Sequence, residues 1–596
     1  MRFKHFALLV ASLLLTVFVF WNYLTNEWAE EEPFTAVAVL DDRTEVFTCR
    51  KDRWNDYYFF FPSYVNLANV RIYPCTKDEI WIGDRMLTSK GISCEQFVPN
   101  EGYGLARIGK ISQYDGSICF VQSGNVPTMY IDVSSGNMEY IHQKKGNEES
   151  GTMHFCTIDG ECSNSFSIES IKGRGNATWE AWKKSYSLTL TDQVDLLGMG
   201  RAQRWILLAN AYDPTNLRNK IGYDLAKAAG MAYSPDSRWV DLYLNGEYAG
   251  VYLLCERNEV HPERVNIAPD NSFLISREKA ERLVSQNYPY IHLKHGKAYR
   301  VHHSSFASQE LEEIWMSMEN ALLSENGIDP RTGRHWTELI DLDSWVKRYL
   351  MDEITANSDG GNISQFYYYD GDSPSPKIYA GPVWDLDITF GWDWQTSSPQ
   401  CYSPQRPIYP YGTEASAFEV LYQEEIFRSR VAEIYEDTFR PLLTELLDTG
   451  FDRYVQEVAA ATNANYRRWA TSDPEKRTAG LKEYLTERIT FLDALLLRQE
   501  EFYDVRMVLE GNVEAWFAVL PGECLPEIPA TGWYVCGSDE PFDVTQPIYK
   551  SVDIYQKQEP ESQDPGEERE SIPVFAALVV TLVVLMLLDK RKCPPK

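Results

Sequence analysis

Two aspartates, Asp385 and Asp387, stand one residue apart in the largely apolar stretch 378–391. A carboxylate that leaves water is costly unless a partner compensates its charge. Mg²⁺ suits such a pair, because it takes one or two carboxylates together with phosphate oxygens. We therefore predict that Asp385 and Asp387 hold Mg²⁺ at the end of a strand. The alternative is an ordinary strand end, with one exposed and one capping aspartate.

Lys184 is the candidate for contact with an anion. Alternation in the run 183–190 places it on one strand face with Tyr186, Leu188 and Leu190. A lysine on an inward face needs an anionic partner, and a bound phosphate is one. The alternative is a lysine that reaches water at the end of the strand.

Arg174 lies between Gly173 and Gly175 in the run 171–179. Glycines around an arginine allow backbone N–H groups to approach an anion closely. The run lacks the Gly-x-x-x-x-Gly-Lys spacing of a P-loop, so an ordinary turn is the alternative.

The elements around the aspartates are predicted to bring two acidic loops together. An amphipathic helix, 342–357, leads into a loop that contains Asp359. Two strands follow, and the second begins at Ile378. Because a hairpin joins the two loops, Asp359 can lie beside Asp385.

Further elements are predicted on both sides of these loops. They are strands at 126–133 and 205–209, a helix at 215–229, a hairpin at 239–255 that turns at Asn245–Gly246, and helices at 305–325 and across 415–503. Glu256 follows the hairpin directly.

Length and charge restrict the class of protein. A chain of 596 residues is too long for one hydrophobic core, so two or three domains are expected. The hydrophobic share of 44% and the aromatic share of 13% are those of a globular protein. The net charge of −30 argues against nucleic acid as a partner, since a phosphate backbone needs a basic surface.

Both ends of the chain carry apolar runs. The run 6–21 follows basic residues and is typical of a signal peptide or an uncleaved signal anchor. The run 572–588 is uncharged and precedes Lys590, Arg591 and Lys592, which predicts a single transmembrane helix with a cytoplasmic tail. The bulk of the chain would then be extracellular, at the cell membrane. A buried core helix is the alternative for 572–588.

Ten of the eleven cysteines fall in the proposed exterior part, where disulfides are expected. The short separations favour the pairs 156/162 and 524/536. Cys593 would lie in the tail, free or lipidated. No Cys-x-x-Cys or Cys/His cluster occurs in the sequence, so no zinc site is predicted.

The predicted organisation has seven parts. They are a signal segment 1–30, a β-rich domain 35–125, a larger mixed domain 126–504, a β-rich appendage 505–554, an acidic stalk 555–571, the transmembrane helix 572–588 and the tail 589–596.

Six motifs in this order resemble the CotH kinase family, named for a spore-coat protein. They are 173–179, 183–190, 207–219, 240–256, 358–362 and 381–391. The resemblance covers roughly 126–500 and implies an α+β, atypical protein-kinase-like bilobal domain, with a β-rich nucleotide lobe and a helical lobe. The β-rich segments before and after it are not explained by the resemblance.

The resemblance also implies ATP and Mg²⁺ as cofactors and a role for each motif. Lys184 would contact the phosphates, Glu256 would lie at the hinge between lobes, Asp359 would be catalytic with Asn362 beside it, and Asp385 and Asp387 would hold the metal. The roles of Asp359 and Glu256 rest on the resemblance alone. The Gly-rich loop of ordinary protein kinases is missing, so phosphate contacts would come from elsewhere, such as Arg174 and its glycines.

Three functions remain open from the sequence. The first is a membrane-anchored extracytoplasmic kinase that phosphorylates hydroxyl side chains of an unidentified protein substrate. The second is a non-catalytic adhesin or structural surface protein, which the 17 tryptophans and the extra β-rich regions favour. The third, a metal-dependent hydrolase, would need a further base or metal cluster that the sequence does not show.

Overall fold

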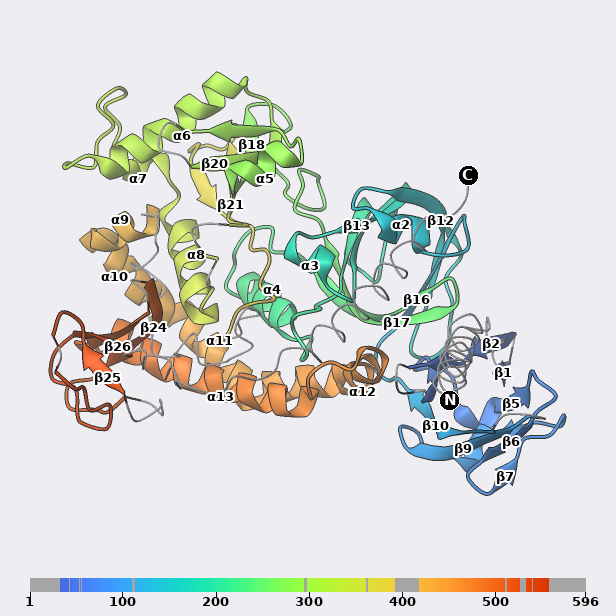
Figure 1. The fold of residues 1–596 in the computed structure, drawn as a ribbon. Coiled ribbons are helices and arrows are strands. Elements are labelled where there is room, and N and C mark those ends of the chain that lie inside the picture. The colour runs from blue at the N-terminus through green and yellow to red at the C-terminus, as the bar shows by residue number, and fades with distance from the viewer. Residues whose placement is uncertain are drawn as a thin grey trace, which may run out of the picture.

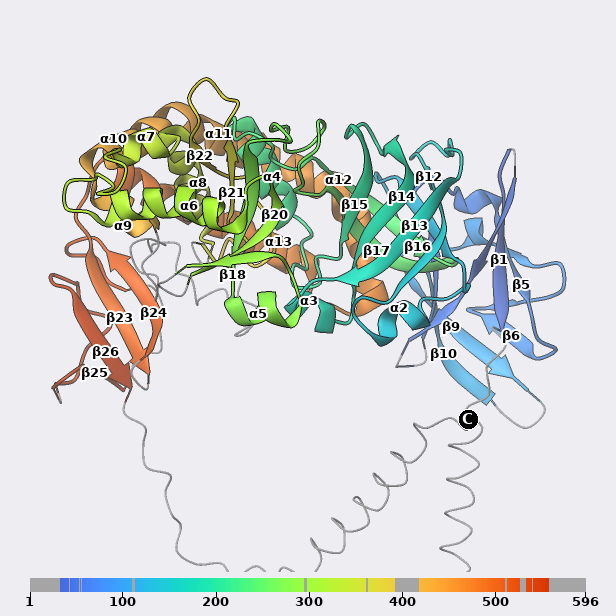
Figure 2. The same cartoon turned by 90° about the horizontal axis from the view of Figure 1, so that it is seen from above.

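The computed structural model describes residues 33–556, apart from 42, 53, 55, 110–112, 294–296, 358, 361–362, 392–416, 510–511, 526–531 and 539. The proposed signal segment 1–30, the transmembrane helix 572–588, the tail and nearly all of the stalk lie outside this part. Among the described residues, no helix is long and apolar enough to cross a membrane. The chain mixes helices and strands, with β-rich regions at opposite ends of the described part (Figures 1 and 2).

The first β-rich region consists of two sheets, as the short aromatic runs predicted. One has the order β2-β1-β5-β8 and the other β3-β4-β10-β9-β6-β7. The strands are β1 (Phe34–Val39), β2 (Thr44–Thr48), β3 (Arg50–Lys51), β4 (Tyr57–Phe61), β5 (Val70–Pro74), β6 (Glu79–Ile82), β7 (Arg85–Met86), β8 (Ile92–Ser93), β9 (Gly102–Ile108) and β10 (Gln113–Gln122). A cavity of about 350 Å³, lined by Arg50, Tyr57, Tyr243 and Glu247 among others, lies where this region meets the next.

Seven strands then form a closed barrel in the order β11-β12-β13-β14-β15-β17-β16. They are β11 (Thr128–Val133), β12 (Glu148–Cys156), β13 (Phe166–Arg174), β14 (Ser185–Asp195), β15 (Arg201–Leu208), β16 (Ser237–Leu244) and β17 (Glu247–Glu256). The predicted hairpin is confirmed, because Asn245 and Gly246 both have positive φ, 50° and 82°, as an Asn-Gly turn requires. Tyr186, Leu188 and Leu190 alternate into the barrel core, as predicted.

A five-stranded sheet follows the barrel in the chain and is the second sheet of the kinase-like part, after the barrel itself. It has the order β19-β20-β18-β21-β22 and lies beside the helical part. Its strands are β18 (Ser272–Glu278), β19 (Tyr290–His292), β20 (Ala298–Ser304), β21 (Phe366–Asp370) and β22 (Ile378–Ala380). The helices inserted along it are α5 (Ala280–Ser285), α6 (Ser308–Leu323), α7 (Trp336–Leu339) and α8 (Leu342–Thr355). The predicted helices at 305–325 and 342–357 are thus confirmed as α6 and α8.

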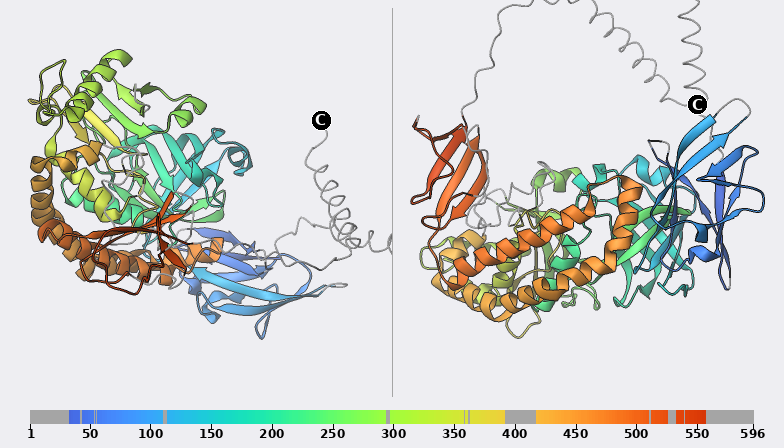
Figure 3. Two further views of the ribbon diagram at one scale, coloured as in Figure 1. Left: turned by 60° about the vertical axis from the view of Figure 1, so that its left-hand side comes forward. Right: turned by 90° about the horizontal axis from the view of Figure 1, so that it is seen from below.

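Two short helices, α2 (Glu139–Gln143) and α3 (Ala177–Glu180), lie between barrel strands in the chain, and the other α-helices form the rest of the helical part. They are α4 (Arg218–Ala228), α9 (Ala417–Gln423), α10 (Glu425–Ile434), α11 (Arg440–Glu445), α12 (Phe451–Trp469) and α13 (Pro474–Leu492). The right-hand view of Figure 3 shows α12 and α13 side by side along one face of the molecule. One apolar core runs from the outer side of the barrel (Leu253) through α8 (Tyr349) to α13 (Leu485). The barrel and the helical part are therefore packed together.

The C-terminal region is a four-stranded sheet in the order β24-β23-β26-β25. Its strands are β23 (Tyr503–Leu509), β24 (Asn512–Val519), β25 (Trp533–Val535) and β26 (Val552–Gln556). The β-rich character predicted for 505–554 is therefore confirmed.

The two predicted disulfides have different outcomes. Cys156 and Cys162 are bonded, as their short separation indicated. The prediction for Cys524 and Cys536 is wrong, because both are free. Cys524 Sγ lies 3.2 Å from the carbonyl oxygen of Thr545 instead. The N–H of Cys536 donates to the carbonyl oxygen of Asp553 in the neighbouring strand β26.

Candidate active site

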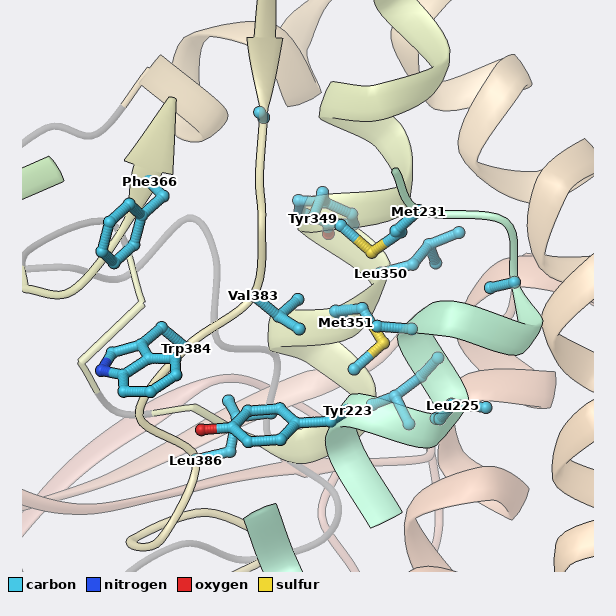
Figure 4. Packing of buried hydrophobic residues seen from close by; sticks show 14 of the residues in the cluster. Tyr223, Leu225, Met231, Tyr349, Leu350, Met351, Phe366, Val383, Trp384 and Leu386 are labelled. Atoms are coloured by element: carbon cyan, nitrogen blue, oxygen red, sulfur yellow. The ribbon is translucent and has the colours of Figure 1, made fainter. Parts of the chain in front are cut away.

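The stretch that carries Asp385 and Asp387 is irregular, not the end of a strand as predicted. Strand β22 ends at Ala380, and Asp385 has a φ of 66°, in the left-handed region. Val383 and Leu386 are buried, and Figure 4 shows both lying near helices α4 and α8. This anchoring by the apolar neighbours leaves both aspartates only half-buried.

Helix α4 holds this acidic stretch through its first turn. Asn219 Oδ1 accepts a hydrogen bond from the N–H of Leu386 over 2.8 Å. Arg218 Nε donates to the carbonyl oxygen of Thr389 over 2.9 Å, while its Nη1 pairs with the buried Asp213 at 2.5 Å. The sequence predicted α4 but gave no role to Arg218 or Asn219. The groups that they hold, on Thr389 and Leu386, lie over 160 residues away in the chain.

The loop with Asp359 is held at both ends by one buried carboxylate, that of Asp352. Asn357 Nδ2 donates to Asp352 Oδ1 over 2.8 Å, and Gln365 Nε2 donates to Asp352 Oδ2 over 2.6 Å. Arg348 balances the charge at 3.0 Å. The loop ends are therefore fixed by groups that have no contact with solvent.

The two acidic loops meet, as predicted. Ser364, at the end of the Asp359 loop, donates from Oγ to Asp385 Oδ2 over 2.8 Å. Burial, and then the charge of Asp385, raises the pKa of Asp359 to about 6. Burial, Asp385 and Asp213 also raise the pKa of Asp387. Negative charge is thus concentrated at one place, where a divalent cation would be stabilised.

These residues fit Mg²⁺ better than a metal that needs a full protein cage. The described residues contain no group of three or more histidine, cysteine, aspartate or glutamate side chains that could hold a metal ion. Mg²⁺ needs fewer, because it keeps several waters and takes one or two carboxylates with phosphate oxygens. Asp385 and Asp387 would be those carboxylates.

Lys184 lies at the barrel end, but its ammonium group has a local partner. It donates to the carbonyl oxygen of Trp179 and lies over the Trp179 ring, 4.8 Å from its centroid. The chain folds back between the two residues, and contact of Lys184 with a phosphate stays a prediction. The preceding Lys183 is buried and donates to the carbonyl oxygen of Val251.

Glu256 is the last residue of β17, where the chain leaves the barrel, and its place at a hinge between lobes stays a prediction. Its carboxylate is engaged, however. Oε1 accepts from Arg264 over 2.7 Å and Oε2 from the N–H of Asp236 over 2.9 Å. Burial raises the pKa of Glu256 to about 7. These contacts hold Glu256 in place. Asn362, the other residue predicted beside the nucleotide, lies outside the described residues.

Arg174 is close to the acidic stretch. Its guanidinium lies over the ring of Trp384, 5.3 Å from the centroid, and Trp384 immediately precedes Asp385. Two further arginines, Arg257 and Arg300, lie near Arg174. The sequence gave no signal for them, because they belong to different strands that only the folded chain brings together.

A family model described as CotH kinase protein matches residues 171–492. The chain belongs to the CotH kinase family. The resemblance drawn from the six motifs is thereby confirmed, and the protein is kinase-like. The matched range contains Lys184, Glu256, Asp359 and Asp385, so the acidic loops belong to the part that defines the CotH kinase family.

Among solved structures, the chain is similar to the crystal structure of a Helicobacter pylori proinflammatory kinase, CtkA. The two share 10% sequence identity, and the match covers 53% of this chain and 94% of that chain, with a TM-score of 0.24. A search of curated proteins finds no match for this CotH kinase family member.

Proposed function

We propose that the protein transfers the γ-phosphoryl group of ATP to hydroxyl side chains of other proteins, with Mg²⁺ as cofactor. The observation that carries this is the hydrogen bond between Ser364 and Asp385, which fixes the loop of Asp359 against a metal-binding carboxylate. Phosphoryl transfer asks the protein mainly for positioning and for neutralisation of charge. Membership in the CotH kinase family supports the reaction class.

Each acidic residue has its own task in this proposal. Asp385 and Asp387 bind the metal, which neutralises negative charge on the phosphates when it is present. Asp359 accepts the proton of the acceptor hydroxyl. With its pKa raised to about 6, Asp359 is a stronger base than an ordinary aspartate and is still mostly ionised at neutral pH.

We further propose that this reaction takes place outside the cell, on a protein anchored by the run 572–588. The uncharged run with basic residues behind it and the Cys156–Cys162 disulfide support an exterior location. The substrate would be a surface or secreted protein.

The experiment is calorimetric titration of the full-length protein with ATP, with and without Mg²⁺. Wild-type protein should bind ATP tightly only with Mg²⁺, and Asp385→Asn should lose the metal dependence. Asp448→Asn, an exposed position on the helical face, is the matched control and should behave as wild type. If wild-type protein binds no ATP, the non-catalytic surface function is correct instead.

A further inference from the structure

Three arginine side chains gather near one another, each from a different strand. Arg174 is the last residue of β13, Arg257 follows β17 directly, and Arg300 lies in β20. Burial, and with it the positive charge of neighbouring arginines, lowers the pKa of both Arg257 and Arg300. Because a guanidinium stays charged at neutral pH, three positive charges remain close together here.

The carboxylates near these arginines, those of Glu259 and Glu278, are paired with the neighbouring Arg204 and Arg282. Glu259 lies 3.8 Å from Arg257, but its Oε2 is paired with Arg204 at 2.6 Å. Lys145 lies at the edge of the group and adds another positive charge. Burial and the neighbouring arginines lower the pKa of Lys145. Like charges at short distance destabilise the fold unless an anion compensates them.

Two arginine N–H groups are buried without an acceptor among the described residues. They are Nη1 of Arg174 and Nε of Arg300. Both guanidinium groups lie on aromatic rings, 5.3 Å from the centroid of Trp384 and 3.5 Å from that of Tyr288. Tyr288 also forms a side-chain hydrogen bond with Arg300, but the two named N–H groups have no acceptor, and a buried donor without a partner costs about 1–3 kcal/mol. The two N–H groups can therefore donate hydrogen bonds to oxygen atoms of a ligand.

This basic group is continuous with the acidic stretch. Arg174 covers Trp384, whose chain neighbour is Asp385. Asn258, next to Arg257, donates from Nδ2 to the carbonyl oxygen of Val383 over 3.4 Å. A ligand with several phosphates could therefore reach both the arginines and a metal ion held by Asp385.

We propose that Arg174, Arg257 and Arg300 bind the phosphate groups of the nucleotide, in place of a lysine. Guanidinium groups bind phosphate oxygens in pairs and with fixed geometry. The candidate lysine, Lys184, and the preceding Lys183 both donate to backbone carbonyls. The assignment rests on the proposed phosphotransferase function and adds Arg257 and Arg300 to Arg174, which the sequence already indicated as a phosphate contact.

The test compares three ligands, ATP, tripolyphosphate and adenosine, by calorimetry on the full-length protein. The variants are Arg174→Gln and Arg300→Gln, with Arg453→Gln as control, since Arg453 is a surface residue with 67% side-chain exposure. Each cluster variant should weaken ATP and tripolyphosphate binding about tenfold or more, because charge-assisted hydrogen bonds are lost. Adenosine affinity should stay unchanged, and Arg453→Gln should bind all three ligands as wild type does.

Stability without ligand separates this role from a structural one. Removing one of several like charges should leave the thermal midpoint of Arg300→Gln unchanged or higher, whereas a structural ion-pair residue would lower it. Arg300→Lys, which keeps the charge but loses the paired geometry, should show intermediate affinity.

Three results would overturn the assignment. If both variants bind ATP with wild-type affinity, the arginines are wrongly assigned while the phosphotransferase function stands. If they lose affinity for an acidic peptide but keep that for ATP, the cluster binds the protein substrate. A wild-type protein that binds neither ATP nor tripolyphosphate would remove the assignment together with the proposed function.

Discussion

Ser364 Oγ and Asp385 Oδ2 lie 2.8 Å apart, although 21 residues separate them in the chain. Ser364 has a φ of 54° and Asp385 a φ of 66°, so both ends of the contact are in the left-handed region. Such conformations persist only where the surrounding structure fixes them. The contact therefore indicates that the surrounding structure holds the two acidic loops together.

Replacing Ser364 by alanine should weaken this connection. We expect kcat/KM for phosphoryl transfer to fall about tenfold to a hundredfold, because a hydrogen bond to a charged carboxylate contributes about 1.5–3 kcal/mol. The Mg²⁺ concentration at half-maximal rate should rise as Asp385 becomes less well positioned. Ser375→Ala, on the exposed turn between β21 and β22, is the matched control. An equal effect of both variants would contradict the positioning role.

Asn219→Ala should disturb the acidic stretch from the side of helix α4. It leaves the buried N–H of Leu386 without an acceptor, so the free energy of unfolding should fall by about 1–3 kcal/mol. Mg²⁺ affinity should fall as well, measured by calorimetry in the presence of ATP. Asn164→Ala, at an exposed position between β12 and β13, should change neither quantity. Loss of stability with unchanged Mg²⁺ affinity would show that Asn219 is merely structural.

The ion pair between Arg488 of α13 and Glu353 of α8 is fully buried, at 2.7 Å. Arg488→Met should lower the free energy of unfolding by about 3–5 kcal/mol, because it leaves a buried carboxylate without its partner. Urea unfolding measures the change. Arg498→Met removes an exposed arginine from the same region and should cost less than about 1 kcal/mol. Similar losses for both would contradict the importance of burial.

His302 should make stability depend on pH. It packs on the ring of Phe366 and is hydrogen-bonded to Ser276. Burial, and then the charges of Arg300 and Arg257, lowers the pKa of His302 to about 3. The unfolded state therefore binds a proton below about pH 6.5, which the folded state does not bind until about pH 3, so stability falls as the pH decreases across this range.

His302→Phe should remove this dependence. Between pH 7 and pH 5, wild-type protein should lose about 2 kcal/mol more of its free energy of unfolding than the variant loses. Denaturant unfolding at both pH values gives the difference. His303→Phe, at the next position of β20, serves as the control, and an equal change in that variant would contradict the assignment to His302.

Local patterns explain the parts that were predicted from the sequence. Alternation in β14 placed Tyr186, Leu188 and Leu190 in the barrel core, and the Asn245–Gly246 turn set the register of the β16–β17 hairpin. The order of elements between α8 and β22 was enough to predict that Asp359 and Asp385 lie near each other.

The rest of the site depends on contacts between distant segments. Alternation cannot show that Lys184 bonds to Trp179, because that contact depends on how the loop before β14 folds back. Likewise, Arg174 and Arg300 are 126 positions apart in the chain and meet only through the packing of the barrel against the second sheet. The hydrogen bonds from Arg218 to Thr389 and from Leu386 to Asn219 likewise join segments that are distant in the chain.

The most direct measurement is transfer of labelled phosphate from ATP by the full-length protein, for wild type and Asp359→Asn, beside their ATP affinities with Mg²⁺. In the proposed reaction Asp359 meets the acceptor hydroxyl and Asp385 the metal, so Asp359→Asn should abolish transfer while ATP still binds with nearly wild-type affinity. Asp385→Asn should lose both. Full transfer by Asp359→Asn, or no transfer and no ATP binding by the wild-type protein, would contradict the proposed kinase activity.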